Sequence, residues 1–91
     1  MDRAEVRSKV KQIIFQVTNI APEKIGDTQS YTRELGLDSL SLMEIGVDVD
    51  YEFQLGLSDE AMRGLDSVDD TVALIERQLE SKRAAAGERV A

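Results

Sequence analysis

The sequence predicts an all-α fold: a small four-helix bundle of three main helices and one short helix, with a long first loop. Apolar residues recur at steps of three and four over three separate stretches, which is the spacing of one face of a helix. Capping residues and glycines stand where these stretches begin and end. With 91 residues, 42% of them apolar and 4% aromatic, the chain is expected to form one domain with a modest aliphatic core.

The first helix is predicted over residues 3–18 and is assigned to the core. Its apolar positions advance by four, three and four residues, and therefore share one face: Val6, Val10, Ile13 and Val17. The long connection over residues 19–38 follows, with scattered apolar anchors. Loops of this length in small domains are functional or are held by their own side chains. We expect this loop to lie across the core, with Tyr31 as a packing residue, and to deliver Ser39 to the surface.

The second helix is predicted over residues 40–54 and carries two apolar stripes. One stripe ends at the aromatic Phe53 and is assigned to the core: Leu42, Ile45, Val49 and Phe53. The other lies about 200° away around the helix, and consists of Leu40, Met43, Val47 and Tyr51. Acidic residues flank it at Glu44, Asp48 and Asp50. Two interpretations remain open: a helix buried on both sides, or a docking face for a partner, which we favour.

Gly46 lies in the middle of this helix, where glycine costs about 1 kcal/mol relative to alanine. Either it allows a neighbouring helix to approach closely, or it leaves room for a bound apolar chain. Of these two hypotheses we favour close packing.

Two further helices complete the bundle. A short helix is expected over residues 58–62, with Ser58 as its cap, and the last helix opens at Ser67. Residues 81–91 show no convincing apolar face, so a disordered tail is expected there. The predicted domain therefore covers residues 3–80.

The composition excludes several classes of function. The chain contains neither cysteine nor histidine, which removes thiolate metal sites and the usual general base, and we expect no metal site. Gly-Leu-Asp-Ser-Leu resembles the motif of Gly-Asp-Ser-Leu hydrolases, but without histidine a serine–histidine pair is impossible. Neither a signal peptide nor a membrane span is recognisable. The absence of cysteine fits a reducing compartment, and we expect a cytoplasmic, monomeric protein.

The net charge of −7 is unevenly distributed and argues against nucleic-acid binding. No Lys or Arg occurs between Glu34 and Met62, although eight acidic residues do: Glu34, Asp38, Glu44, Asp48, Asp50, Glu52, Asp59 and Glu60. Such a span is either a solvated face or a field that steers basic partners. We favour the second interpretation, because the span also contains a candidate modification site, Ser39.

Ser39 is that candidate, because it stands where the second helix begins. Asp38 and Ser39 are both good capping residues. The unpaired N–H groups and the positive end of the helix dipole favour a phosphate ester at this position.

The sequence around this serine resembles that of acyl carrier proteins. The matching residues are Tyr31, then Leu35-Gly36-Leu37-Asp38-Ser39-Leu40, and then Glu44, Ile45 and Phe53 at the family's spacing. The resemblance covers about residues 3–80. It implies that a phosphopantetheinyl transferase attaches 4′-phosphopantetheine from coenzyme A to Ser39, with Asp38 in a supporting role. The chain itself would not be an enzyme.

The resemblance also implies a set of partners. The arm would hold acyl groups as thioesters for fatty acid, polyketide or lipopeptide biosynthesis. An acyl-loading ligase or acyltransferase would charge it, and synthase, condensing or modifying enzymes with basic docking patches would use it. The partner-binding residues expected on the second helix are Leu40, Met43, Glu44, Val47, Asp48, Asp50 and Tyr51.

The chain departs from the family pattern in two places. Fatty-acid carriers show more glutamates late in the second helix, where this chain has Asp48-Val49-Asp50-Tyr51-Glu52, and Gly46 replaces an apolar residue. These differences favour a specialised pathway of secondary metabolism. The alternatives are a peptidyl carrier, although Leu37 stands where such proteins have a second glycine, and an unmodified helical adaptor.

Overall fold

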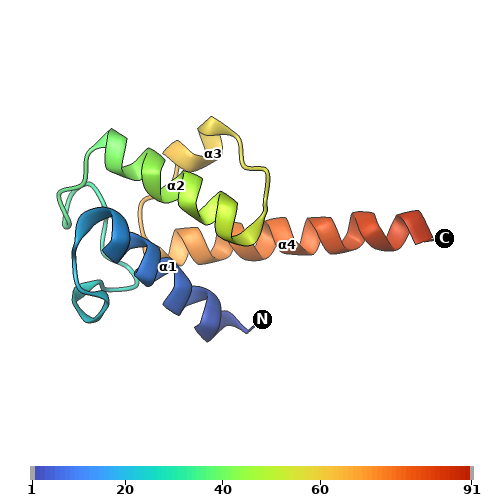
Figure 1. Ribbon diagram of the computed structural model, residues 1–91, viewed down its shortest axis with the longest axis horizontal. Coiled ribbons are helices and arrows are strands. Elements are labelled where there is room, and N and C mark those ends of the chain that lie inside the picture. Colours follow the sequence, from blue (N-terminus) through green and yellow to red (C-terminus); the bar gives the residue numbers. More distant parts are fainter. Residues whose placement is uncertain (1, 91) are drawn as a thin grey trace.

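The protein is an all-helical bundle, as predicted, and a computed structural model describes residues 2–90, with side chains described as far as residue 83. The elements are α1 (Arg3–Thr18), the 3-10 turn η1 (Pro22–Lys24), α2 (Ser39–Phe53), α3 (Asp59–Arg63) and α4 (Val68–Val90). In Figure 1, α1, α2 and α4 form the body, the short α3 lies beside α2, and α4 projects beyond the other helices. The loop between α1 and α2 wraps one end of the body.

Side-chain caps define where the helices begin. Asp2 accepts a hydrogen bond from the N–H of Glu5 at the start of α1, and Ser58 accepts one from Ala61 at the start of α3. Asn19 ends α1 in the left-handed region, with φ of 65°. Each cap satisfies a backbone group that the helix itself leaves unpaired. The short polar residues of the sequence therefore set the helix boundaries.

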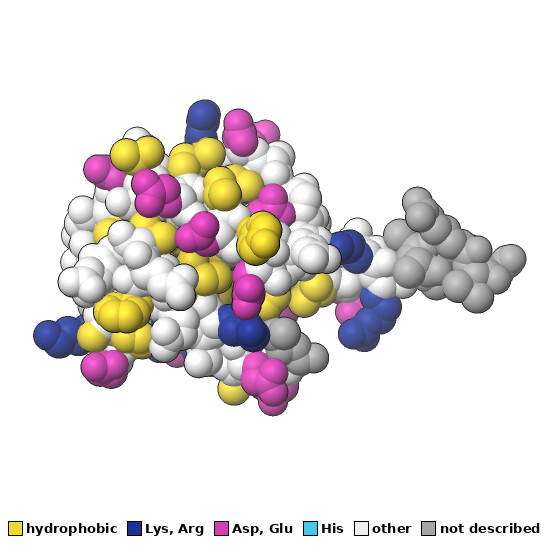
Figure 2. Space-filling view, viewed as in Figure 1, with side chains coloured by type: hydrophobic (Ala, Val, Ile, Leu, Met, Phe, Trp, Pro, Cys, Tyr) yellow, Lys and Arg dark blue, Asp and Glu magenta, His cyan; other side chains and the backbone are white. Residues whose placement is uncertain are grey.

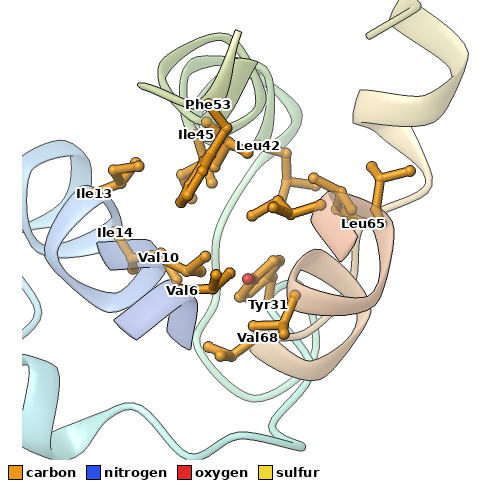
Figure 3. Close-up of a cluster of buried hydrophobic side chains, with 14 of the residues drawn as sticks. Val6, Val10, Ile13, Ile14, Tyr31, Leu42, Ile45, Phe53, Leu65 and Val68 are labelled. Atoms are coloured by element: carbon orange, nitrogen blue, oxygen red, sulfur yellow. The ribbon is translucent and has the colours of Figure 1, made fainter. Parts of the chain in front are cut away.

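The core is aliphatic and is built where α1, α2 and α4 meet (Figure 3). Nine of its aliphatic side chains are at most 2% exposed: Val6, Val10, Ile14, Ile25, Ile45, Val49, Val68, Val72 and Ile75. The Phe53 stripe of α2 faces this core, as predicted. Tyr31 enters the core from the loop, and its phenol oxygen lies 2.8 Å from Oγ1 of Thr71. The prediction that Tyr31 is a packing residue is confirmed.

Gly46 allows α2 and α3 to approach each other closely. A Cβ atom on Gly46 would lie 2.8 Å from both Cβ and Cγ of Met62, closer than nonbonded carbons come. The space beside Gly46 is thus filled by Met62, which is itself buried. Of the two hypotheses for this glycine, close helix packing is correct, and reserved room for an acyl chain at this point is not.

Helix α4 continues into the segment for which the sequence predicted a disordered tail. Its backbone is helical to Val90, and the ammonium group of Lys82 donates a hydrogen bond to the carbonyl of Gln54 at the end of α2. Alanine, arginine, lysine and glutamate are strong helix formers, so a helix can continue there without an apolar face. Ala91 lies outside the described residues. The division into a domain of residues 3–80 and a tail stays a prediction.

Candidate functional site

Ser39 is the first residue of α2, and its side chain is exposed. Asp38 precedes it as the N-cap, in extended conformation, and its Oδ1 accepts a hydrogen bond of 2.9 Å from the N–H of Ser41. This backbone hydrogen bond lowers the pKa of the Asp38 carboxyl below its usual value, although the residue is open to solvent. Ionised Asp38 therefore holds the first turn of α2 in place beside Ser39.

The surroundings of Ser39 fit a phosphate-linked group. The hydroxyl faces solvent, and the first turn of α2 contains no acidic side chain. The leading N–H groups of a helix have no partner within the helix, and they form the positive end of its dipole. A phosphate joined to Ser39 would lie at that end. Asp38 contributes a negative charge there, but its carboxylate is directed to the N–H of Ser41.

The segment before Ser39 is a tight turn. The N–H of Leu35 donates to the carbonyl of Ser30 at 3.0 Å, and that of Leu37 donates to the carbonyl of Tyr31 at 2.8 Å. Gly36 lies between them with φ of +70°, a conformation that side-chain-bearing residues rarely adopt. The glycine of the Leu-Gly-Leu-Asp-Ser sequence is therefore required by the backbone path that leads to Ser39.

The second apolar stripe of α2 is largely exposed, as the docking interpretation requires. Leu40, Val47 and Tyr51 are 68%, 52% and 84% exposed, and Met43 is half-buried. Figure 2 shows hydrophobic and acidic side chains intermingled over α2 and α3, with fewer basic side chains on this face. We call Leu40, Glu44, Val47, Asp48 and Tyr51 the exposed α2 face, since all five are open to solvent.

Asp50 has a different role from its acidic neighbours on α2. Its Oδ1 accepts hydrogen bonds from three consecutive backbone N–H groups: Leu55 at 3.1 Å, Gly56 at 2.6 Å and Leu57 at 3.3 Å. The carboxylate thereby organises the turn that follows α2. The sequence placed Asp50 among the docking residues. Its position shortly before a Leu-Gly-Leu turn was the one signal of this structural role.

Two open grooves lie on the surface, away from Ser39. The first lies between α1 and α2, has a volume of about 510 Å³, and includes Ile13 and Tyr51 in its lining. The second, of about 520 Å³, lies between α3 and α4 and includes Leu65 and Leu74. Ser39 lines neither groove. Within the described residues, no helix combines the length and apolarity that crossing a bilayer requires.

Comparison with known proteins identifies the family. Residues 8–75 match the family model described as "Phosphopantetheine attachment site". The chain is 35% identical over 82 residues to the meromycolate extension acyl carrier protein of Mycobacterium bovis (strain ATCC BAA-935 / AF2122/97), covering 90% of this chain and 71% of that protein.

Solved structures of acyl carrier proteins share the fold. The acyl carrier protein of Enterococcus faecalis aligns with a TM-score of 0.68 and 32% identity, over 82% of this chain and 95% of that one. The apo doublet acyl carrier protein from prodigiosin biosynthesis aligns with a TM-score of 0.73 over 81% of this chain, but this chain spans only 36% of it. At 23% identity, the doublet protein shows the fold alone. The family model and the relatives together establish that the chain belongs to the acyl carrier proteins, which bind phosphopantetheine.

Proposed function

We propose that this chain carries acyl groups on a 4′-phosphopantetheine arm attached to Ser39. The observation that carries the proposal is the exposed hydroxyl of Ser39 at the start of α2, within a family defined by phosphopantetheine attachment. When attached, the arm supplies a thiol that holds an acyl group as a thioester. The chain's own residues present the serine and bind partners, and the partner enzymes catalyse the reactions.

Attachment is a group transfer onto the Ser39 oxygen. Oγ of Ser39 gives up its proton to a base of the phosphopantetheinyl transferase and bonds to the phosphorus nearer the pantetheine in coenzyme A. The pyrophosphate bond breaks, and adenosine bisphosphate leaves. Ser39 is thus an acceptor, and Asp38 supports it by holding the helix start through Ser41.

One intact-mass experiment tests this proposal. The protein is incubated with coenzyme A and a broad-specificity phosphopantetheinyl transferase, and the expected product carries one phosphopantetheine. Ser39→Ala abolishes the mass gain, whereas Ser41→Ala, which removes the other hydroxyl of the same helical turn, retains it. A folded wild-type protein that gains no mass contradicts the carrier function and favours an unmodified adaptor.

We assign the exposed α2 face to docking of enzymes with basic surfaces. Exposed Leu40, Val47 and Tyr51 supply apolar contact area, and Glu44 and Asp48 supply charge beside it. Residues 34–62 contain no Lys or Arg, so all charged side chains in this segment are acidic. Such a field speeds the encounter with basic partners and weakens as salt is added.

Charge reversal on this face tests the docking assignment. Glu44→Lys and Asp48→Lys raise the KM of the transferase for the carrier at low ionic strength, with a smaller effect at high ionic strength. Thermal stability stays close to that of the wild type, because neither side chain makes a hydrogen bond or ion pair among the described residues. Unfolding of either variant would show that the face is structural.

The cargo we propose is an acyl chain rather than a peptide. The 35% identity to proteins named for meromycolate extension supports a role in fatty-acyl chain biosynthesis. Mass analysis of the protein isolated from its native cells reads the cargo directly. An aminoacyl or peptidyl group on Ser39 would contradict this assignment and leave the carrier function intact.

A further inference from the structure

The loop that leads to Ser39 is tied to the connection between α3 and α4 through one residue, Asp66. The hydroxyl of Ser30 donates to Oδ1 of Asp66 at 2.9 Å, and that of Thr32 donates to the same oxygen at 3.3 Å. The backbone carbonyl of Asp66 accepts the N–H of Tyr31 at 2.6 Å. The guanidinium of Arg33 lies 3.7 Å from Oδ2 of Asp66. Four consecutive loop residues therefore contact one aspartate.

The same loop residues hold the turn before Ser39. The carbonyl of Ser30 accepts the N–H groups of Glu34 and Leu35, both at 3.0 Å, and the carbonyl of Tyr31 accepts that of Leu37. Leu37 is followed by Asp38, the cap of α2, and then by Ser39. Asp66 is therefore connected to Ser39 by a continuous series of hydrogen bonds and covalent backbone links.

Two of the four anchored residues, Ser30 and Tyr31, are buried, whereas Thr32 and Arg33 are exposed and Asp66 is half-buried. Ser30 is 5% exposed and Tyr31 is fully buried. The phenol of Tyr31 adds a second attachment, to Thr71 of α4. The hydrogen bond from the hydroxyl of Ser30 lowers the pKa of the Asp66 carboxyl. A donor lowers the pKa of a carboxyl in this way because it stabilises the ionised form.

We propose that Asp66 is a positioning residue for phosphopantetheine transfer: by holding Ser30 and Thr32 it fixes the turn of residues 34–38 and thereby the direction in which Ser39 presents its hydroxyl. This inference rests on the proposed function. Asp66 does not touch the reacting atoms. The Ser39 oxygen still forms the bond to phosphorus, and Asp66 acts on it only through the loop.

Amide hydrogen exchange tests the anchor without any enzyme. Asp66→Ala accelerates exchange at Leu35 and Leu37, whose N–H groups bond to Ser30 and Tyr31, and leaves exchange at buried Ile14 of α1 unchanged. Asp70→Ala is the matched control, an exposed carboxylate near the same end of α4. Equal acceleration at Leu37 and Ile14 would show a global loss of stability and would overturn the positioning role.

Transfer kinetics test the consequence for Ser39. Asp66→Ala removes the acceptor of Ser30 and Thr32. With coenzyme A and a broad-specificity transferase, it lowers kcat/KM by about fivefold, the factor equivalent to about 1 kcal/mol. Asp66→Asn keeps an acceptor oxygen for Ser30 and recovers most of that loss, and Asp70→Ala matches the wild type. The assay is run at a temperature where every variant is folded.

The carrier function and the positioning role of Asp66 can be contradicted independently of each other. A wild-type protein that gains no phosphopantetheine contradicts the proposed function, while the exchange experiment still judges the anchor. Wild-type modification together with an unchanged kcat/KM in Asp66→Ala overturns the positioning role alone.

Discussion

Two regions meet at Ser39: the loop of residues 19–38 before it and the exposed α2 face after it. The loop is irregular in backbone, yet Tyr31 is fully buried and its phenol bonds to Thr71, while its neighbours Ser30 and Thr32 donate to Asp66. Farther back, Asp27 pairs with Lys11 at 2.8 Å and with Arg7 at 3.6 Å. The helix is regular, yet it presents Tyr51 with 84% of its surface open.

The region without regular secondary structure thus makes the tertiary contacts, whereas the outer face of the regular helix makes few. The loop makes tertiary contacts that fix where α2 begins, so its side chains matter for folding. The exposed α2 face makes few internal contacts, so its side chains are free to serve partners. Substitutions in the loop should therefore change stability, and substitutions on the exposed face should change partner kinetics.

The largest effect is expected in the loop, at Tyr31. Tyr31→Ala empties a fully buried site and should lower the free energy of unfolding by about 3–5 kcal/mol. Urea denaturation measures this change. Tyr31→Phe is the control: it removes only the hydrogen bond to Thr71, whose hydroxyl still donates to the carbonyl of Ser67, and should cost about 1 kcal/mol. Equal losses in both variants would contradict the packing role.

Gly46 tests the border between the buried and exposed sides of α2. Gly46→Ala places a Cβ 2.8 Å from Cβ of Met62, so α2 and α3 must separate. Overpacking of this kind costs about 1–3 kcal/mol, which exceeds the gain of about 1 kcal/mol in helix propensity. Thermal unfolding should show a net loss. At Gly64 the new Cβ meets only ordinary contacts of 3.6 Å or more, so Gly64→Ala should not destabilise the protein.

Asp50 and Asp48 sharpen the comparison within one helix. Asp50→Ala leaves the N–H groups of Gly56 and Leu57 without this acceptor, while that of Leu55 keeps the backbone carbonyl of Asp50; the free energy of unfolding should fall by about 1–2 kcal/mol. Asp48→Ala should change it by less than about 0.5 kcal/mol, because surface substitutions away from such features have little effect. Chemical denaturation of the pair decides this. Should Asp48 prove the costlier residue, the division between structural and docking acids would be wrong.

The smallest expected effect is the response to acid. The pKa of Asp66 is lowered by the Ser30 hydroxyl, and that of Asp27 is lowered by its hydrogen bond from Lys11. A carboxyl with a lowered folded-state pKa stabilises the protein above its unfolded value of about 3.9, and this stabilisation disappears as the pH falls through the folded-state pKa. Stability should therefore fall below about pH 4. Ser30→Ala should make the acid response of unfolding shallower, and an unaltered profile would contradict the Ser30–Asp66 contact.

Much of the fold followed from local patterns in the sequence. Periodicity placed the main helices, Ser58 and Asp38 marked helix starts, and two stripes on one helix identified its inner and outer faces. Ser39 was located in the same way, because capping chemistry depends on neighbours a few residues apart. The exposed part of the second stripe was predicted correctly, although its docking role stays a prediction.

Contacts between distant residues were decided only by the tertiary structure. Asp66 meets Ser30 across 36 positions of sequence, and Gly46 is explained only by Met62 on another helix. The sequence predicted a surface role for Asp50, but in the structure the turn after α2 donates hydrogen bonds to its carboxylate. A sequence shows which side chains share a helix face, because that spacing is fixed by the backbone. It does not show which residue of another element will fill the space beside them, because packing selects that partner only when the whole chain is folded.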